Sequence, residues 1–162
     1  MVLEVIFMWN KTKSVTLSIA VCFFFVAVLT AAIFLAPFII KLWFTSFRGW
    51  NPDGAAMQKM LVLFSCCFYP SVPLAYITLY SLLKLLFNIK NDKVFVAANV
   101  KHLRRISWCC FIVALITLVG GFFYIPFLCV FVAAAFVGLM LRVVKNVMQN
   151  AAEIKAENEL TI

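Results

Sequence analysis

The chain has 162 residues, of which 66% are hydrophobic and only 12% are charged. Soluble proteins typically carry about 25% charged residues, so this composition excludes a sizeable soluble domain and predicts one membrane-embedded unit. The formal net charge of +8 could suit nucleic acid, but the basic residues flank long apolar stretches. Because that distribution is typical of a topology signal, we expect no direct nucleic acid binding.

Three stretches of the chain contain no charged side chain, at residues 14–40, 60–83 and 106–141. A bilayer core about 30 Å thick requires roughly 20 helical residues, so each of the two shorter stretches fits one crossing. The third fits two crossings, because Gly120-Gly121 and Pro126 are turn and helix-start signals. The sequence therefore predicts an all-α integral membrane four-helix bundle. It forms a single domain, 1–162, with spans at about 15–40, 60–83, 104–121 and 125–146.

The distribution of Lys and Arg predicts the orientation of this bundle. With these spans, eleven basic residues lie on the side of the two termini, and only Lys41, Arg48 and Lys59 lie on the other side. Loops rich in Lys and Arg stay in the cytoplasm, so both termini should be cytoplasmic. The cytoplasmic face then consists of the loop 84–103 and the tail 147–162. The lipid bilayer is the partner that the composition itself predicts.

The second span carries two prolines within Tyr69-Pro70-Ser71-Val72-Pro73. Each proline removes a backbone donor, which predicts a static kink; a hinge or cavity wall is the alternative. Tyr69, Pro73, Tyr76 and Tyr80 follow helical steps of four and three and therefore share one stripe. We expect this intramembrane seam (Tyr69, Pro70, Pro73, Tyr76, Tyr80) to face other helices as a helix–helix contact, with a small ligand pocket as the alternative.

The loop 84–103 is the most distinctive polar segment. Asn91-Asp92 is a candidate helix N-cap, and Val96, Val100 and Leu103 then repeat at helical spacing. This pattern predicts an amphipathic helix at the inner interface, which either faces lipid headgroups or docks a cytosolic partner. In span 4, Ala134 and Gly138 form a small-xxx-small pair that allows close helix approach, within the bundle or across a homodimer.

The spans contain no deeply placed ionisable residue, which disfavours ion-coupled transport. The only histidine, His102, lies in a basic segment without a nucleophile or carboxylate for a catalytic pair. The six cysteines form no C-x-x-C motif, and a zinc site would require three or four convergent ligands. We therefore expect no catalytic residue, no metal and no cofactor, and a protein that is not an enzyme.

Two short motifs resemble a known family. They are Phe95-x-x-x-Asn99-Val100-x-x-Leu103-Arg104-Arg105-Ile106 and the terminal Glu157-Asn158-Glu159-Leu160-Thr161-Ile162. On these motifs and on the layout of its spans, the chain resembles the bacterial family catalogued as domain of unknown function 2975, small four-span membrane proteins. The family pattern usually has Asp where this chain has Glu159, a change that keeps the charge. The resemblance implies a location in the bacterial cytoplasmic (inner) membrane.

Members of that family are commonly encoded beside a small helix-turn-helix regulator. The resemblance thus implies a regulatory membrane protein that binds or sequesters a cytosolic transcription regulator. The residues expected to contact it are Phe95, Asn99, Leu103, Arg104, Arg105, Glu157, Glu159, Leu160, Thr161 and Ile162. One alternative is an immunity protein that intercepts a membrane-active peptide with the loop 47–54. The other is a small-molecule- or lipid-binding bundle without ion coupling.

Overall fold

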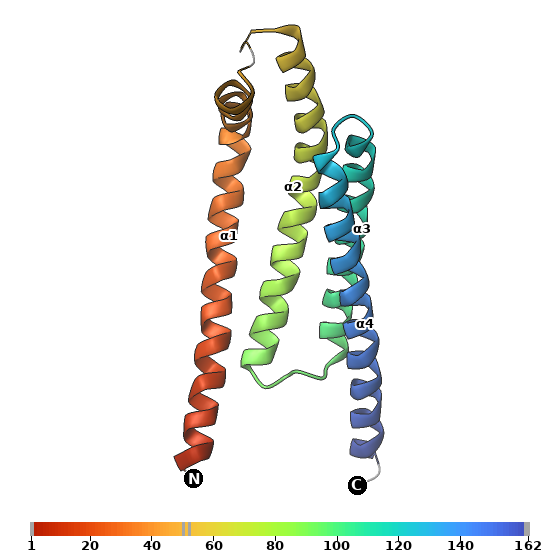
Figure 1. Ribbon diagram of the computed structural model, residues 1–162. Helices are drawn as coiled ribbons and strands as arrows, with labels where there is room; N and C mark the ends of the chain where they lie inside the picture. The colour runs from red at the N-terminus through yellow and green to blue at the C-terminus, as the bar shows by residue number, and fades with distance from the viewer. Residues whose placement is uncertain (1, 50, 52, 161–162) are drawn as a thin grey trace.

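The computed structural model describes residues 2–49, 51 and 53–160, and these form four long helices joined by short connections (Figure 1). The helices are α1 (Val2–Arg48), α2 (Ala55–Lys90), α3 (Ala97–Gly121) and α4 (Pro126–Leu160). Each of the four contains a segment long and apolar enough to cross a membrane. This result confirms the all-α class and is consistent with four membrane spans.

The helices are longer than the predicted spans. At 1.5 Å per residue the 35 residues of α4 extend about 52 Å, well beyond the roughly 30 Å of a bilayer core. Both chain ends lie at the same end of the molecule, which we call the terminal end (Figure 1). The opposite end, the loop end, holds the connections 49–54 and 122–125. Segments 84–103 and 147–160, expected as loop and tail, are mostly continuations of α2, α3 and α4.

The four helices pack in chain order instead of closing into a compact bundle. Within the described residues, the backbone of α1 approaches only that of α2, and α2 also packs against α3, which packs against α4 (Figure 1). The expectation of a compact four-helix bundle is corrected in this respect. Lipid chains are as apolar as the side chains of a helix, so an open row of helices exposes nothing that the bilayer cannot solvate.

Helices α3 and α4 pack closely at Gly138. A methyl group added at Gly138 would lie 3.3 Å from the ring of Phe111 and 3.4 Å from the Cβ of Cys110, both on α3. The hydroxyl of Ser107 donates a hydrogen bond of 2.8 Å to the Gly138 carbonyl. Close approach at Gly138 is therefore confirmed, and it occurs within the chain.

An aromatic cluster around the buried ring of Phe44 joins α1 and α2 to the α3–α4 turn at the loop end, and no sequence motif predicts it. The ring of Phe44, which is 1% exposed, lies 5.9 Å from that of Phe64 and 6.1 Å from that of Tyr124. Phe64 in turn lies 4.9 Å from Phe127. The guanidinium of Arg48 covers Phe44 and Tyr124 at 6.0 and 5.8 Å from their ring centroids. Among the described residues, the backbone of α1 approaches only that of α2. The aromatic cluster therefore adds side-chain contacts between α1 and the α3–α4 turn.

The predicted seam on α2 meets α1. The Tyr76 hydroxyl lies 2.7 Å from the Thr30 hydroxyl, and the Tyr69 hydroxyl lies 3.5 Å from the Ile33 carbonyl. The remaining members face outward: Tyr80, Pro70 and Pro73 are exposed, and the ammonium of Lys84 lies 5.9 Å from the Tyr80 ring. The helix continues through both prolines. Two tyrosines of the seam thus act as the expected helix–helix contact.

Candidate partner-binding site at the terminal end

The connection between α2 and α3 shapes the site. The predicted N-cap at Asn91-Asp92 is wrong, because Asn91 instead caps the C-terminus of α2 and Asp92 adopts a left-handed conformation with φ of 56°. Helix α3 begins after Val96, which provides no side-chain cap. Asn and Asp tolerate the left-handed region better than most residues, so the same pair serves equally well at the end of a helix.

Asn99 holds this connection together. Its side chain is 0% exposed, and its amide nitrogen donates to the carbonyls of Lys93 and Val94 at 2.8 and 2.7 Å. Its amide oxygen accepts a 2.7 Å hydrogen bond from the amide of Asn88 at the end of α2. A buried amide needs such partners because an unsatisfied polar group is costly. Asn99 was expected to contact a partner, but it is buried and offers no surface for such a contact. It instead fixes the conformation of the connection between α2 and α3.

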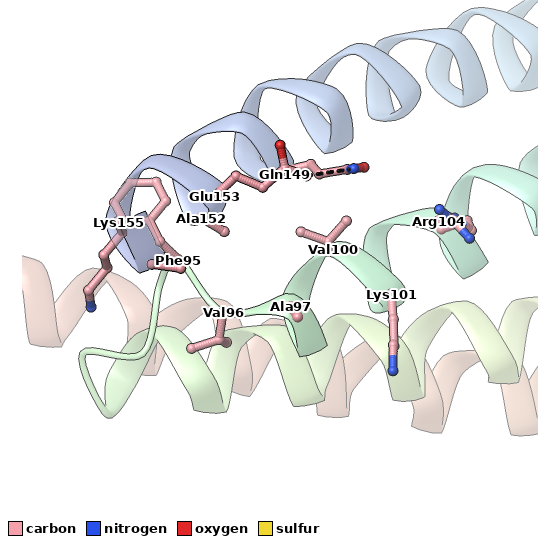
Figure 2. A pocket seen from close by; sticks show the side chains of 11 residues that line it. Phe95, Val96, Ala97, Val100, Lys101, Arg104, Gln149, Ala152, Glu153 and Lys155 are labelled. Carbon is pink, nitrogen blue, oxygen red and sulfur yellow. Dashed lines mark hydrogen bonds between the residues drawn. The ribbon is translucent and has the colours of Figure 1, made fainter. Parts of the chain in front are cut away.

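An open groove of about 590 Å³ lies at the terminal end, between the start of α3 and the last turns of α4 (Figure 2). We call it the partner groove. Its lining residues come from the connection and both helices: Phe95, Val96, Ala97, Val100, Lys101, Arg104, Gln149, Ala152, Glu153, Lys155 and Ala156. Val100 points from α3 toward α4, and Phe95 lies beside the end of α4 close to Lys155 and Ala152 (Figure 2). Phe95 remains 46% exposed and is the main exposed apolar side chain of the groove.

The predicted contact residues divide into four groups: those that line the groove, those that are buried, those exposed outside its lining, and those outside the described part of the structure. Phe95 and Arg104 line the groove. Leu103 is buried and faces the protein interior, whereas Arg105 is exposed outside the groove lining. Glu157 is exposed and follows directly on Ala156, the last lining residue. The side chains of Glu159 and Leu160, and the residues Thr161 and Ile162, lie outside the described part of the structure.

The groove has an apolar floor and a mainly basic rim. Lys101, Arg104 and Lys155 contribute three positive charges, against the single carboxylate of Glu153. That carboxylate already accepts a 3.0 Å hydrogen bond from the amide of Gln149, one helical turn earlier. The groove therefore suits an apolar segment that carries acidic side chains, because complementary charge favours association and fixes orientation.

The α4 side of the groove was missed at the sequence level, although a signal existed. Gln149, Ala152, Glu153 and Ala156 are spaced by three, one and three residues, which places them on one face of a helix. Small alanines at two of these positions leave the space that the groove occupies. Residues 147–162 were expected to form a tail, so no packing of this segment against α3 was predicted.

Among the described residues, no three His, Cys, Asp or Glu side chains are close enough to hold a metal ion. The six cysteines are free thiols, and Cys67 packs against Gly120, where an added methyl group would lie 2.7 Å from its sulfur. The groove presents apolar side chains and three basic side chains, which makes it the candidate site of this structure.

Comparison with known proteins supports a membrane location. A family model described as "Protein of unknown function (DUF2975)" matches residues 50–162, which is more than half of the chain and includes both helices that form the groove. The chain is also similar to the uncharacterized membrane protein YoaS of Bacillus subtilis (strain 168). The two are 23% identical over 167 residues, an alignment that covers 94% of this chain and 99% of the relative. No solved structure matches.

Proposed function

We propose that this chain, which belongs to the DUF2975 family, is a regulatory membrane protein that binds a small cytosolic helix-turn-helix regulator in the partner groove. The observation that carries the proposal is that α3 and α4 bring together two segments about 50 residues apart in the sequence. One contains the inner-loop motif, and the other leads directly into the acidic and apolar C-terminal motif.

The proposal requires the terminal end to face the cytoplasm. Eleven of the 14 basic residues belong to this end, and that excess supports a cytoplasmic position through the positive-inside rule. A fluorescent protein fused after residue 162 should therefore fluoresce, and an alkaline phosphatase fused there should be inactive. Active phosphatase at this position would reverse the orientation and exclude a cytosolic partner.

The chemistry of the groove supports an amphipathic helix with acidic flanking residues as the partner surface. An amphipathic helix can insert apolar side chains at successive turns into a hydrophobic groove, and Phe95, Val100 and Ala152 supply the matching floor. Acidic residues flanking that helix would meet Lys101, Arg104 and Lys155. Binding of the regulator there would hold it at the membrane and away from DNA, without any catalytic step.

The first test is affinity purification from native membranes in mild detergent, read by mass spectrometry. We expect the wild-type protein to recover a small helix-turn-helix protein, and Ala152→Trp, which fills the groove, to lose it. Asn150→Trp is the matched control, because residue 150 is exposed on the same helix and does not line the groove. Recovery of the same regulator by Ala152→Trp at the wild-type level would refute the groove as its site.

The C-terminal motif is tested separately. Deleting Leu160-Thr161-Ile162 should reduce recovery of the regulator while the protein still inserts into the membrane. A charge reversal, Lys101→Glu, should do the same, whereas Lys90→Glu at the same end but outside the groove should not. Unchanged recovery after the deletion would restrict the binding site to the groove and remove the role of the tail.

A further inference from the structure

A second pocket, of about 280 Å³, lies between α3 and α4 nearer to the middle of the molecule than the partner groove. Its lining is formed by three basic side chains, one hydroxyl and two aromatic rings: Arg104, Ser107, Trp108, Phe111, Arg142 and Lys145. We call it the basic pocket. The four residues on α3 follow helical steps of three, one and three, and the two on α4 are three apart, so each helix presents one face to it.

A hydrogen bond between the two helices borders the basic pocket. Ser107 is buried, and its hydrogen bond to the Gly138 carbonyl joins α3 to α4 beside the pocket. Within the described residues, no carboxylate forms an ion pair with Arg104 or Arg142, and the Lys145 ammonium donates only to the side-chain oxygen of Asn146 at 2.9 Å. Three cations thus line one cavity, and no carboxylate lies among its lining residues.

The position of the basic pocket along the chain indicates its depth in the membrane. Arg105 and Arg142 bound the stretch of 36 uncharged residues that forms the two last spans. The pocket therefore lies where the hydrocarbon core meets the headgroups. Trp108 lines it and is 57% exposed, as is typical of tryptophan at a membrane interface.

An apolar stripe leads away from the pocket along α3. Trp108, Ile112, Leu115 and Val119 are all exposed and are separated by steps of four, three and four residues. They form a continuous surface from the interface toward the centre of the bilayer. A ligand with an anionic head and long hydrocarbon chains would fit both the pocket and the stripe.

We propose that the basic pocket binds the phosphate of an anionic phospholipid headgroup, whose acyl chains lie along the stripe that begins at Trp108. Guanidinium groups bind phosphate oxygens through two parallel hydrogen bonds, and an ammonium adds a third charged donor. Basic pockets between membrane helices at the headgroup level are suited to anionic lipids. Inorganic phosphate shares this headgroup chemistry but would leave the apolar stripe unused.

The test uses the full-length protein with Trp108 as the sole tryptophan, the other three being replaced by phenylalanine. It is reconstituted into phosphatidylcholine vesicles containing the same fraction of either brominated phosphatidylglycerol or brominated phosphatidylcholine. We expect stronger quenching of Trp108 by the anionic lipid. Each basic side chain lost in Arg142→Gln/Lys145→Gln should lower the preference about fivefold, because a charge near anionic headgroups contributes about 1 kcal/mol. Lys90→Gln/Lys93→Gln removes the same charge from exposed positions outside the pocket and should lower the quenching preference of Trp108 less; an equal fall in both variants would overturn the proposal.

Arg104 is left intact because it also lines the partner groove, so failure of this proposal is distinguishable from failure of the proposed function. If millimolar inorganic phosphate abolishes the preference and binds the detergent-purified protein, the site takes soluble phosphate and the lipid assignment is overturned. Equal quenching of Trp108 by the two brominated lipids, in the protein whose basic side chains are intact, would by itself overturn the proposal.

Discussion

Removal of the Asn99 amide should destabilise the terminal end. Asn99→Ala eliminates the hydrogen bonds to Asn88, Lys93 and Val94, all 2.7–2.8 Å long, from a side chain that is 0% exposed. A hydrogen bond of this kind contributes a net of roughly 1 kcal/mol, so the loss of all three should cost about 3 kcal/mol. The carbonyls of the connection can recover part of this by binding water, which makes the figure an upper value.

The stability of the variants can be measured through the reactivity of the three buried cysteine thiols. Cys22, Cys67 and Cys109 are buried, so a thiol-reactive fluorogenic dye will report unfolding of the detergent-solubilised protein during heating. Asn99→Ala should melt several degrees below the wild type, and trypsin should cleave more rapidly at Lys90 and Lys93.

A control variant and a double variant distinguish the loss of the Asn99 hydrogen bonds from the loss of any asparagine amide. Asn150→Ala, on the exposed face of α4, should melt like the wild type. Asn88→Ala loses one of the three bonds, and adding it to Asn99→Ala should cost almost nothing more, because the shared bond is already gone. An Asn99→Ala protein that melts within a degree of the wild type, with an unchanged trypsin pattern, would refute the reasoning.

Three further substitutions test the packing of the helices by the same thermal assay. Gly138→Leu should destabilise the α3–α4 pair by about 1–3 kcal/mol, since even a methyl group there lies 3.3 Å from an α3 ring; wild-type stability would show that the pair can separate freely. Phe44→Ala should cost about 3–5 kcal/mol, whereas Phe47→Ala, at a 72% exposed position, should cost little; equal effects would contradict the buried cluster. Tyr76→Phe should cost only about 0.6 kcal/mol through the lost contact with Thr30, and a loss of several kcal/mol would mean that this contact does more than join α1 to α2.

The number and class of the helices could be predicted because charge is expensive in hydrocarbon. The stretches without charged residues mark the crossings directly, and Gly120-Gly121 with Pro126 divides the longest one. The packing order could not be predicted in the same way. In α1 and α4 nearly every face is apolar, so the sequence contains no polar side that would show which face meets another helix.

The inner connection shows a different limit. The family motif placed Asn99 among the residues expected to contact a partner, and the structure instead buries it against carbonyl groups that only the folded connection supplies. Asn91-Asp92 suits the start and the end of a helix equally well, and tertiary context selected the end. Phe95 and Arg104, which the motif singled out, line the groove. Their α4 neighbours depend on register between two helices, which no local pattern specifies.

The central claim is that the partner groove binds a cytosolic regulator. The most direct measurement is photo-crosslinking in living cells from a benzoylphenylalanine placed at residue 152, compared with the same group at residue 150. We predict that position 152 crosslinks to a small helix-turn-helix protein and that position 150 does not. Equal crosslinking of that protein from both positions, or none from position 152 while the fold is intact, would contradict the account.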